Sequence, residues 1–582
     1  MRYLALCTDY DGTIAHDERV DAQTIAALEA LRATGRKLVL VTGREIPDLQ
    51  RVFEPLELFD RIVAENGALL YRPATKEERL LAAAPPARFV EELRRRGVER
   101  ISTGRCIVAT WVPHETTVLE TIRDLGLEMQ VVFNKGAVMV LPSGINKATG
   151  LRAALDELNV SVHNSVGVGD AENDHAFLSI CECSAAVANA LPAVKETADI
   201  ALTQSHGAGV RQLMDEMIAD DLAKRAPLLR RHEVLLGHDQ RGAPLTIAPY
   251  GVSAFVVGTS GGGKSTISIG LIERLSAKQY SFCVIDPEGD YDLVEGAAVL
   301  GSPDRAPSVD ECMQLLAKPD QNAVINLVGL KLSDRPNFFL TLLPRIRDLR
   351  AKTGRPHWLV VDEAHHVMPA GWQPTDVVLP QRLDGTLLVS VTPSVVAATA
   401  LRLVDTLVVI GEKPREMVHE FAQANGIPAP VVPAEKIPQG EALLWHKDAG
   451  VGLQRMVLEP ARMERRRHLR KYSEGSLPED RSFFFRGAEG KLKLRAHNLI
   501  VFLDLADGVD EDTWRFHWNR GEVSSWIRVC IKDEGLAEKI AAVEREEPED
   551  ATSSRQRVRE LIEESYTLPA EAGSAPARAA SN

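Results

Sequence analysis

The sequence predicts an α/β multidomain protein in which two α/β blocks are followed by a mostly helical unit. Its 582 residues exceed the roughly 250–300 that a single hydrophobic core can organise. Short apolar runs alternate with helical stretches through residues 1–215 and again through 233–457, which is typical of parallel sheets covered by helices. Residues 460–546 have fewer strand-like runs, and Trp514 and Trp518 lie four apart on one face of a predicted helix.

Composition and charge narrow the class of protein before any motif is considered. The chain is 45% hydrophobic and 26% charged, which is typical of globular proteins and excludes a fibrous or disordered chain. No run approaches the ~20 consecutive apolar residues that span a bilayer, and the first residues lead into a strand-like run without room for a signal peptide. With seven scattered cysteines and a net charge of −14, we expect a cytoplasmic protein that has no disulfide framework and no membrane contact.

Shifts in composition divide the chain further. Residues 72–141 interrupt the strand–helix alternation of the first block and are interpreted as a small inserted α+β cap. The end of the chain is rich in Ala, Pro and Ser after one helical stretch, Arg555–Tyr566. The expected units are 1–215 with the cap at 72–141, a linker at 216–232, an α/β block at 233–457, a mostly helical unit of unknown role at 460–546, and a largely disordered tail at 547–582.

Two carboxylates follow the first predicted strand. Asp9 and Asp11, in the run DYDGT, lie on the same side of the chain because side chains alternate along a strand. Two adjacent carboxylates repel each other unless a cation or a shared proton relieves them. The pair therefore suits a Mg²⁺-dependent phosphoryl transfer, in which one carboxylate attacks phosphorus and the other shuttles a proton to the leaving oxygen. A surface turn is the alternative.

Three further segments favour the catalytic interpretation. Thr42 and Gly43 end the second strand with a hydroxyl and a backbone N–H that suit phosphate oxygens. Lys147 can neutralise charge shared by a nucleophile and a phosphate, and Asp170 and Asp174 are spaced to converge on one hard cation. Open α/β sheets bind ligands at the carboxyl ends of their strands, where all of these residues are predicted to lie. Four coincidences in this order argue against surface turns.

The set resembles the haloacid dehalogenase phosphatases, and in particular the Cof-type branch that includes sucrose-phosphate and phosphoglycolate phosphatases. The resemblance covers about residues 1–210, including Glu65-Asn66-Gly67-Ala68 and the position of the cap. It implies a Rossmann-like domain that hydrolyses a phosphorylated small metabolite through an aspartyl-phosphate. The implied roles are Asp9 as nucleophile, Asp11 as general acid and base, Thr42, Gly43, Lys147 and Asn173 at the substrate phosphate, and Asp9, Asp11, Asp170 and Asp174 around Mg²⁺.

A second motif opens the 233–457 block. The run GTSGGGKST matches G-x-x-x-x-G-K-[ST], follows a predicted strand and begins a predicted helix, as a phosphate-binding P-loop requires. Glycines allow backbone N–H groups to surround phosphates at a helix N-terminus. The predicted ATP contacts are Gly258, Ser260, Gly261, Gly263, Lys264, Ser265 and Thr266, with Lys264 at the β- and γ-phosphates and Ser265 on Mg²⁺.

Acidic residues follow another buried strand about ninety residues later. Asp362 suits the second coordination sphere of the metal, and Glu363 suits the polarisation of an attacking water. Glu363 therefore favours ATP hydrolysis over transfer to a small acceptor. Thr392 ends a later strand, where it can sense the γ-phosphate or simply cap the strand.

These features resemble the HerA/FtsK-type ATPases over about residues 233–415, most specifically in the segment from Asp286 to Tyr291 (DPEGDY). The resemblance implies a RecA-like P-loop domain, a homo-oligomer such as a hexameric ring, and an arginine supplied by the neighbouring subunit. The candidates for that arginine are Arg345, Arg347, Arg350, Arg382 and Arg402. The glutamine of the family's sensor strand is absent, which argues against motor activity more than against ATP binding.

The favoured function is a Mg²⁺-dependent phosphatase that acts on a phosphorylated small metabolite and is coupled to an ATP-binding domain. The alternative is a DNA-translocating ATPase with an accessory phosphatase for nucleotides or DNA ends. The acidic total charge and the lack of a recognisable DNA-binding module make nucleic acid the less favoured partner. A kinase/phosphatase with opposing reactions and an ATP-gated scaffold are two further alternatives.

Overall fold

The computed structural model has two compact units, residues 1–459 and 460–582. It describes residues 1–566 except 135, 260–262, 293, 319–320, 356, 373–381, 434, 448–451, 462–476, 478, 488–489, 491, 532 and 546–549. Within this part of the chain, none of the helices combines the length and apolar character that a bilayer crossing needs.

The first sheet has eight strands in the order β12-β11-β10-β1-β2-β3-β4-β5. The six strands from β12 to β3 are parallel, and β4 and β5 are antiparallel additions. The strands are β1 Ala5–Thr8, β2 Lys37–Val41, β3 Arg61–Ala64, β4 Leu69–Arg72, β5 Glu77–Leu80, β10 Ser165–Gly169, β11 Cys183–Ala186 and β12 Ile200–Ala201. A Rossmann-like α/β domain, expected from the alternating sequence pattern, is therefore present.

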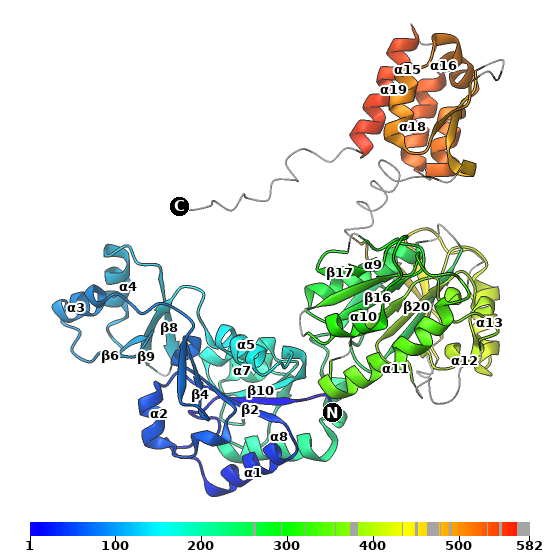
Figure 1. Ribbon diagram of the computed structural model, residues 1–582. Coiled ribbons are helices and arrows are strands. Elements are labelled where there is room, and N and C mark those ends of the chain that lie inside the picture. The colour runs from blue at the N-terminus through cyan, green and yellow to red at the C-terminus, as the bar shows by residue number, and fades with distance from the viewer. Residues whose placement is uncertain are drawn as a thin grey trace. The chain divides into compact units, whose positions relative to one another are not determined.

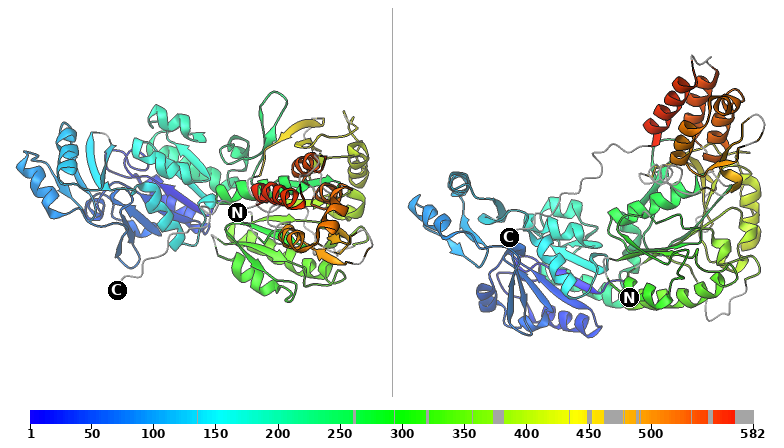
Figure 2. Two further views of the ribbon diagram at one scale, coloured as in Figure 1. Left: turned by 90° about the horizontal axis from the view of Figure 1, so that it is seen from above. Right: turned by 45° about the horizontal axis from the view of Figure 1, so that its top comes forward.

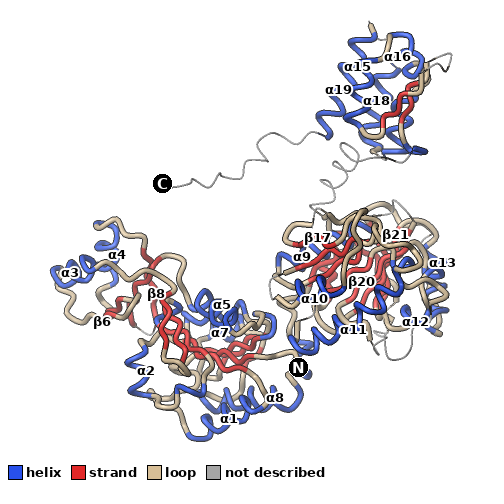
Figure 3. Tube along the Cα trace, viewed as in Figure 1, coloured by secondary structure: helices blue, strands red, loops and turns tan. Residues whose placement is uncertain are grey.

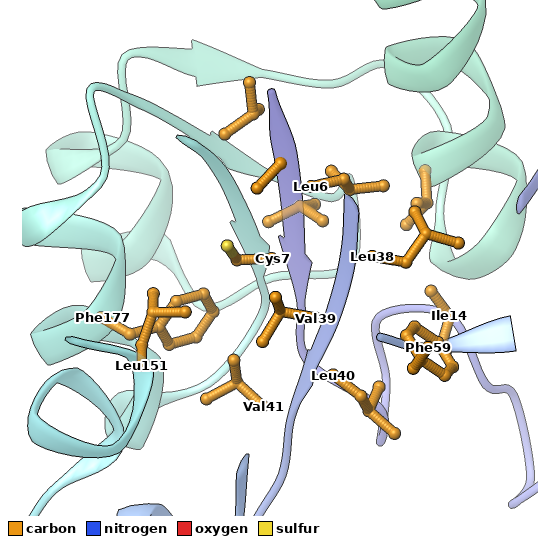
Figure 4. Close-up of a cluster of buried hydrophobic side chains, with 14 of the residues drawn as sticks. Leu6, Cys7, Ile14, Leu38, Val39, Leu40, Val41, Phe59, Leu151 and Phe177 are labelled. Carbon is orange, nitrogen blue, oxygen red and sulfur yellow. The ribbon is translucent and has the colours of Figure 1, made fainter. Parts of the chain in front are cut away.

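Helices cover both faces of this sheet: α1 and α8 lie on one side and α5 and α7 on the other (Figure 1). The helices are α1 Ala22–Ala33, α2 Ile46–Val52, α5 Lys147–Glu157, α6 His175–Ile180, α7 Pro192–Thr197 and α8 His206–Asp220. The central strands are buried on both faces: Val39 of β2 lies toward Phe177, whereas Leu40 lies toward Phe59 (Figure 4). A strand buried on both faces requires a continuous apolar run, which is what β2 has.

The inserted cap begins later than the sequence predicted. The expected insertion at 72–141 includes β5, yet β5 pairs with β4 and extends the main sheet. All four residues of β5 are exposed, so it lacks the apolar alternation that would have identified it as a strand. The cap itself comprises α3 Ala87–Arg95, α4 Glu115–Asp124 and a separate sheet of order β6-β7-β9-β8, with β6 Ser102–Thr103, β7 Val108–Trp111, β8 Met129–Asn134 and β9 Ala137–Pro142.

An eleven-stranded sheet follows, in the order β14-β13-β23-β22-β21-β15-β20-β19-β16-β18-β17. Its strands from β21 to β17 are parallel. The strands are β13 Val234–His238, β14 Pro244–Ile247, β15 Ser253–Gly258, β16 Phe282–Asp286, β17 Ala297–Leu300, β18 Asn322–Asn326, β19 Trp358–Val361, β20 Thr386–Ser390, β21 Thr406–Ile410, β22 Glu441–His446 and β23 Gln454–Leu458. The helices are α9 Lys264–Ala277, α10 Val309–Leu316, α11 Arg335–Thr353, α12 Ala398–Leu401 and α13 Pro414–Asn425. Figure 3 shows the strands of each sheet side by side, with helices flanking them.

A buried polar network lies within the first unit. The Glu182 carboxylate accepts a hydrogen bond from the Tyr280 hydroxyl at 2.7 Å and lies 2.7 Å from Nδ1 of His163. Nε2 of His163 is in turn 2.7 Å from the carbonyl oxygen of Lys278, at the carboxyl end of α9. Although burial raises the pKa of Glu182, hydrogen bonding to His163 and the charge of Arg2 lower it to about 2.

The second unit is mostly helical. It contains the hairpin β24 Phe483–Phe485 with β25 Leu494–Ala496, and the helices α15 Leu499–Gly508, α16 Glu511–Trp518, α17 Glu522–Trp526, α18 Glu534–Arg545 and α19 Ala551–Tyr566. The right view of Figure 2 shows these helices (orange to red) packed side by side. The helix predicted at Arg555–Tyr566 is present as α19, but Val558 and Ile562 are buried in the apolar core of this unit, so the unit extends beyond the predicted boundary at residue 546.

Candidate active site

Three neighbouring strands of the first sheet end at one edge. Asp9 directly follows β1, Thr42 follows β2 and Asp170 follows β10. Because β10 and β2 pair with β1 on opposite sides, Asp9 lies between the other two strand ends. The backbone N–H of Asp9 donates to the carbonyl of Val168 at 3.0 Å, which continues the ladder to the edge. All three side chains are buried.

Lys147 joins two of the carboxylates. It is the first residue of α5, a helix capped by Asn146, and only 2% of it is exposed. Its Nζ donates at 2.6 Å both to Oδ1 of Asp9 and to Oδ1 of Asp174. Burial lowers the pKa of Lys147, but the two carboxylates, Asp174 foremost, raise it by more, so the side chain is held as an ammonium ion.

The carboxylates themselves form a cluster that suits a divalent cation. One carboxylate oxygen from each of Asp9, Asp170 and Asp174 lies within 4.8 Å of the others. Asp174 is oriented by backbone N–H groups, since its Oδ2 accepts from Asp170 at 2.8 Å and from Ala171 at 2.9 Å. Thr13 donates its hydroxyl to Asp170 at 3.2 Å.

Charge balance shows that these residues fit Mg²⁺. When all three carboxylates are ionised they carry three negative charges, of which Lys147 offsets one, and a divalent cation would neutralise the remaining two. Without such a cation, burial and the charge of Asp174 raise the pKa of Asp9 to about 8. Hard cations of this kind bind oxygen ligands. Asp9, Asp170 and Asp174 would therefore hold a divalent cation such as Mg²⁺.

Asp11 lies apart from this cluster of carboxylates. Arg44 donates two hydrogen bonds of 2.7 Å to it, from Nε to Oδ2 and from Nη2 to Oδ1. Arg44 also pairs with Asp48 at 2.6 Å. The sequence predicted the Asp11 carboxylate among the metal ligands. In the structure it binds Arg44 instead, and the carboxylate cluster consists of Asp9, Asp170 and Asp174. Although Asp9 and Asp11 are only two residues apart, the chain turns after β1 and the Asp11 side chain points to the arginine that follows Gly43.

The loop after β3 contacts the expected phosphate-binding residues. Oδ1 of Asn66 accepts from Nδ2 of Asn173 at 2.9 Å, and a Cβ on Gly43 would lie 3.3 Å from the same oxygen. The Thr42 hydroxyl accepts the N–H of Arg44 at 3.1 Å. The sequence alone assigned no role to Arg44 or Asn66. Their position just after β2 and β3, at the edge that holds Asp9, is the signal that would have identified them.

Lys264, the lysine of the predicted P-loop, lies at the start of α9, directly after a Gly263 with φ of +100°. Nζ of Lys264 donates to the carbonyl of Gly258, six residues earlier, at 2.9 Å. The P-loop predictions for Ser260 and Gly261 lie outside the described residues. Gly258 itself ends β15. The lysine thus follows the strand and opens the helix, as the motif requires.

Glu363 lies close enough to Lys264 for their charges to interact. Burial raises the pKa of Glu363, and the charge of Lys264 lowers it. Its φ of +38° is unusual for a residue with a side chain and marks local backbone strain. Asp362 follows β19 and is 8% exposed. The Thr392 hydroxyl lies 3.2 Å from that of Ser394, which is a local turn contact.

Several of the candidate arginines have partners within this chain. Arg350 donates to the carbonyls of Asp384 and His357, both at 2.7 Å. Arg382 donates to the carbonyl of Gly251 at 2.6 Å, Arg402 to that of Ala424 at 3.0 Å, and Arg345 pairs with Asp310. Arg350 is the least suited to act in a neighbouring site, because moving it would leave those carbonyls without a donor.

Comparisons with known proteins concern the first part of the chain. The model of the haloacid dehalogenase-like hydrolases matches residues 6–97 and 113–214. A phosphoglycolate phosphatase of Haloarcula marismortui is 31% identical over 212 residues, which cover 35% of this chain and 92% of that protein. Phosphoglycolate phosphatase 2 of Saccharolobus solfataricus is 27% identical over 230 residues, or 39% of this chain and 97% of that protein. A solved haloacid dehalogenase-like hydrolase from Bacteroides thetaiotaomicron shares 19% identity with a TM-score of 0.33, over 37% of this chain and 99% of that one.

Proposed function

Because the chain belongs to the haloacid dehalogenase-like hydrolases through its residues 6–97 and 113–214, we propose that it hydrolyses a small phosphomonoester at the site around Asp9. One observation carries this proposal: a single buried lysine, Lys147, bonds both Asp9 and Asp174 at 2.6 Å. It holds one carboxylate oxygen of Asp9 at the edge of the sheet where ligands of α/β folds bind.

The reaction divides into two displacements. The Asp9 carboxylate attacks phosphorus, the bond from phosphorus to the ester oxygen breaks, and an aspartyl-phosphate forms. Water then attacks that phosphorus and releases inorganic phosphate and free Asp9. Mg²⁺, when bound, would offset the charge of the phosphoryl oxygens. Lys147 supplies a fixed positive charge to the same oxygens, and Thr42 and Gly43 offer hydrogen-bond donors beside them.

Asp11 would move the proton in both halves. As the general acid it protonates the departing ester oxygen, and as the general base it takes a proton from the attacking water. Its two bonds to Arg44 match the ionised form, which is the form that accepts the proton from water. In the first half, an approaching phosphate ester would compete with Asp11 for Arg44 and free the carboxylate to carry a proton.

The substrate class follows from the relatives, which are phosphoglycolate phosphatases. We therefore expect a small phosphorylated metabolite, with 2-phosphoglycolate as the first compound to try. The test is phosphate release from 2-phosphoglycolate, sugar phosphates and nucleotides with Mg²⁺, for the wild type and Asp9→Asn in parallel. A substrate whose turnover disappears in Asp9→Asn supports the proposal, and undiminished turnover in that variant refutes it.

We further propose that residues 233–457 bind and hydrolyse ATP and act in an oligomeric ring. The proximity of Lys264 and Glu363 supports this, because a phosphate-binding lysine and a water-polarising glutamate must face one γ-phosphate. Titration with ATP and Mg²⁺ should show binding that Lys264→Ala removes, and the protein's mass should rise above that of a monomer. A monomer that does not bind ATP would refute this part alone. DNA-stimulated ATP hydrolysis would favour the translocating alternative.

A further inference from the structure

Glu65 is a buried carboxylate outside the cluster at Asp9, and it links the main domain to the cap. It directly follows β3 and is 1% exposed. Its Oε1 accepts the backbone N–H of Arg105 at 2.8 Å, and its Oε2 accepts those of Cys106 at 2.7 Å and Ile107 at 3.0 Å. One side chain thus binds three successive backbone donors of the cap, just before β7.

The backbone on both sides of these bonds is shaped for them. Glu65 has φ of +50°, a left-handed conformation that residues with side chains rarely adopt. A side chain at position 104 would collide with Glu65, because a Cβ on Gly104 would lie 2.7 Å from the Glu65 carboxyl carbon. Burial raises the pKa of Glu65, whereas the three N–H donors lower it. A buried carboxylate on a strained backbone costs folding free energy, which indicates that Glu65 has a specific function.

On the main-domain side, the same loop is bonded to the phosphate-binding segment. The N–H of Glu65 donates to the carbonyl of Arg44, and the N–H of Asn66 donates to that of Thr42, each at 3.1 Å. The Glu65 carboxylate is therefore rigidly placed relative to the strand end that is expected to hold the substrate phosphate.

On the cap side, the contact leads through the sheet of the cap to β8, which lies against the segment that contains Asp174. Residues 105–107 run into β7, β7 pairs with β9, and β9 pairs with β8. β8 in turn lies against residues 172–174, the segment that contains Asp174. The hydrogen bonds of Glu65 to the cap therefore determine the position of β8 beside the active site. A substrate's phosphate is held by the main domain, so its remaining part is left for the cap to contact.

We propose that Glu65 is a positioning residue that fixes the cap relative to the phosphate-binding loop and thereby sets selectivity for the leaving group of the substrate. This inference rests on the proposed phosphatase function. The donors that Glu65 binds lie at residues 105–107, inside the stretch 98–112 that separates the two segments matched by the family model. Glu65 itself lies in the first matched segment, so the contact joins a loop that the family model matches to a stretch of the cap that it does not match.

The test compares two substrates in Glu65→Ala: the best substrate of the metabolite panel, and p-nitrophenyl phosphate, whose flat aryl group needs no specific contact. Loss of the anchor should lower kcat/KM for the best substrate by about 10-fold or more, mainly through KM, because small displacements of positioning elements are costly. The value for p-nitrophenyl phosphate should change less than about two-fold, since Asp9 and Lys147 are untouched. Equal losses on both substrates, or no loss on either, would overturn the proposal.

Three more variants separate positioning from folding. Gly104→Ala displaces the carboxylate from the cap side and should reproduce the selectivity loss even where Glu65→Ala fails to fold. Glu65→Gln should restore part of the selectivity, because one oxygen can still accept from Cys106 and Ile107. Glu78→Gln is the matched control: its carboxylate pairs with the exposed Arg105 side chain at 3.0 Å, and its kinetics should equal those of the wild type. If Gly104→Ala keeps full selectivity, the proposal is wrong.

Failure of the proposed function would look different. A wild type without Asp9-dependent turnover on any substrate removes the phosphatase and this inference together. A wild type that is active and selective, with equally selective Glu65→Ala and Gly104→Ala variants, removes this inference alone.

Discussion

The two lysines that are predicted to meet phosphate are held in different ways. Nζ of Lys147 bonds Asp9, 138 residues away in sequence, and Asp174, 27 residues away. Nζ of Lys264 bonds the carbonyl of Gly258, six residues away in its own loop. The first site is therefore assembled by the tertiary fold before any ligand arrives, whereas the lysine of the second has a local bond that a nucleotide phosphate can replace.

This difference has a consequence for mutagenesis. Around Asp9, each charged group orients another, so a single change disturbs several contacts at once. Lys264 bonds a carbonyl of its own loop and its charge acts on Glu363, which belongs to the same second sheet, so a change there should leave the first sheet intact. The predictions below test whether the two sites are separable in this way.

The largest effect is expected for Asp9→Asn. Removal of the attacking carboxylate should lower phosphatase kcat by about 10⁴-fold or more, as for other nucleophile deletions. ATP binding should stay within two-fold of the wild type, since Asp9 makes no described contact with the second sheet. Steady-state phosphate release and nucleotide titration measure the two quantities. A parallel loss of nucleotide binding would show that the sites are not separable.

Removal of divalent cations should affect the first site nearly as strongly. With EDTA the three carboxylates lose the charge that balances them, and several kcal/mol of charge stabilisation are lost, or about 10²-fold in rate or more. Mg²⁺ should restore phosphate release, and Ca²⁺ should restore less, because it prefers longer bonds and more ligands. Full activity in EDTA would contradict the assignment of Asp9, Asp170 and Asp174 as metal ligands.

Lys264→Ala tests the other side of the comparison. Loss of a charge that contacts phosphate should weaken ATP binding or hydrolysis by about 10²-fold. Phosphatase activity without ATP should be unchanged. Isothermal titration with ATP and phosphate release from the best metabolite are the paired measurements, and Lys278→Ala, at the opposite end of α9, is the control.

The smallest expected effect is on stability, at Glu182. Its pKa in the folded protein is about 2, against 4.5 for the ordinary side chain. The stabilisation is complete above pH 4.5 and declines as pH falls toward 2, because protonation then favours the unfolded chain. At roughly 1.4 kcal/mol per pKa unit, it amounts to up to about 3 kcal/mol at pH 7.

Urea unfolding of wild type and Glu182→Gln should therefore differ most at pH 7 and converge as the pH falls from 4.5 toward 2. A difference that is the same at both ends of this range would show that Glu182 contributes by packing and not by charge.

The sequence predicted the strand-end residues well for a physical reason. Asp9, Thr42 and Asp170 each follow a short apolar run, and parallel strands bring such ends together whatever the details of packing. The α/β character of the first domain follows from the same runs.

The remaining features depend on where side chains point after the chain has turned. Asp11 pairs with Arg44, 33 residues away, and Glu65 accepts hydrogen bonds from the cap about 40 residues away. No local sequence pattern encodes either contact. The exposed strand β5 was missed because its four residues include three charged ones and no alternation.

The most direct test of the central claim is phosphate release from 2-phosphoglycolate and the best panel substrate by three proteins side by side, with Mg²⁺ and without ATP. The wild type and Lys264→Ala should release phosphate at equal rates, and Asp9→Asn should release almost none. Turnover that survives in Asp9→Asn, or that disappears in Lys264→Ala, would contradict a self-contained phosphatase site built on Asp9.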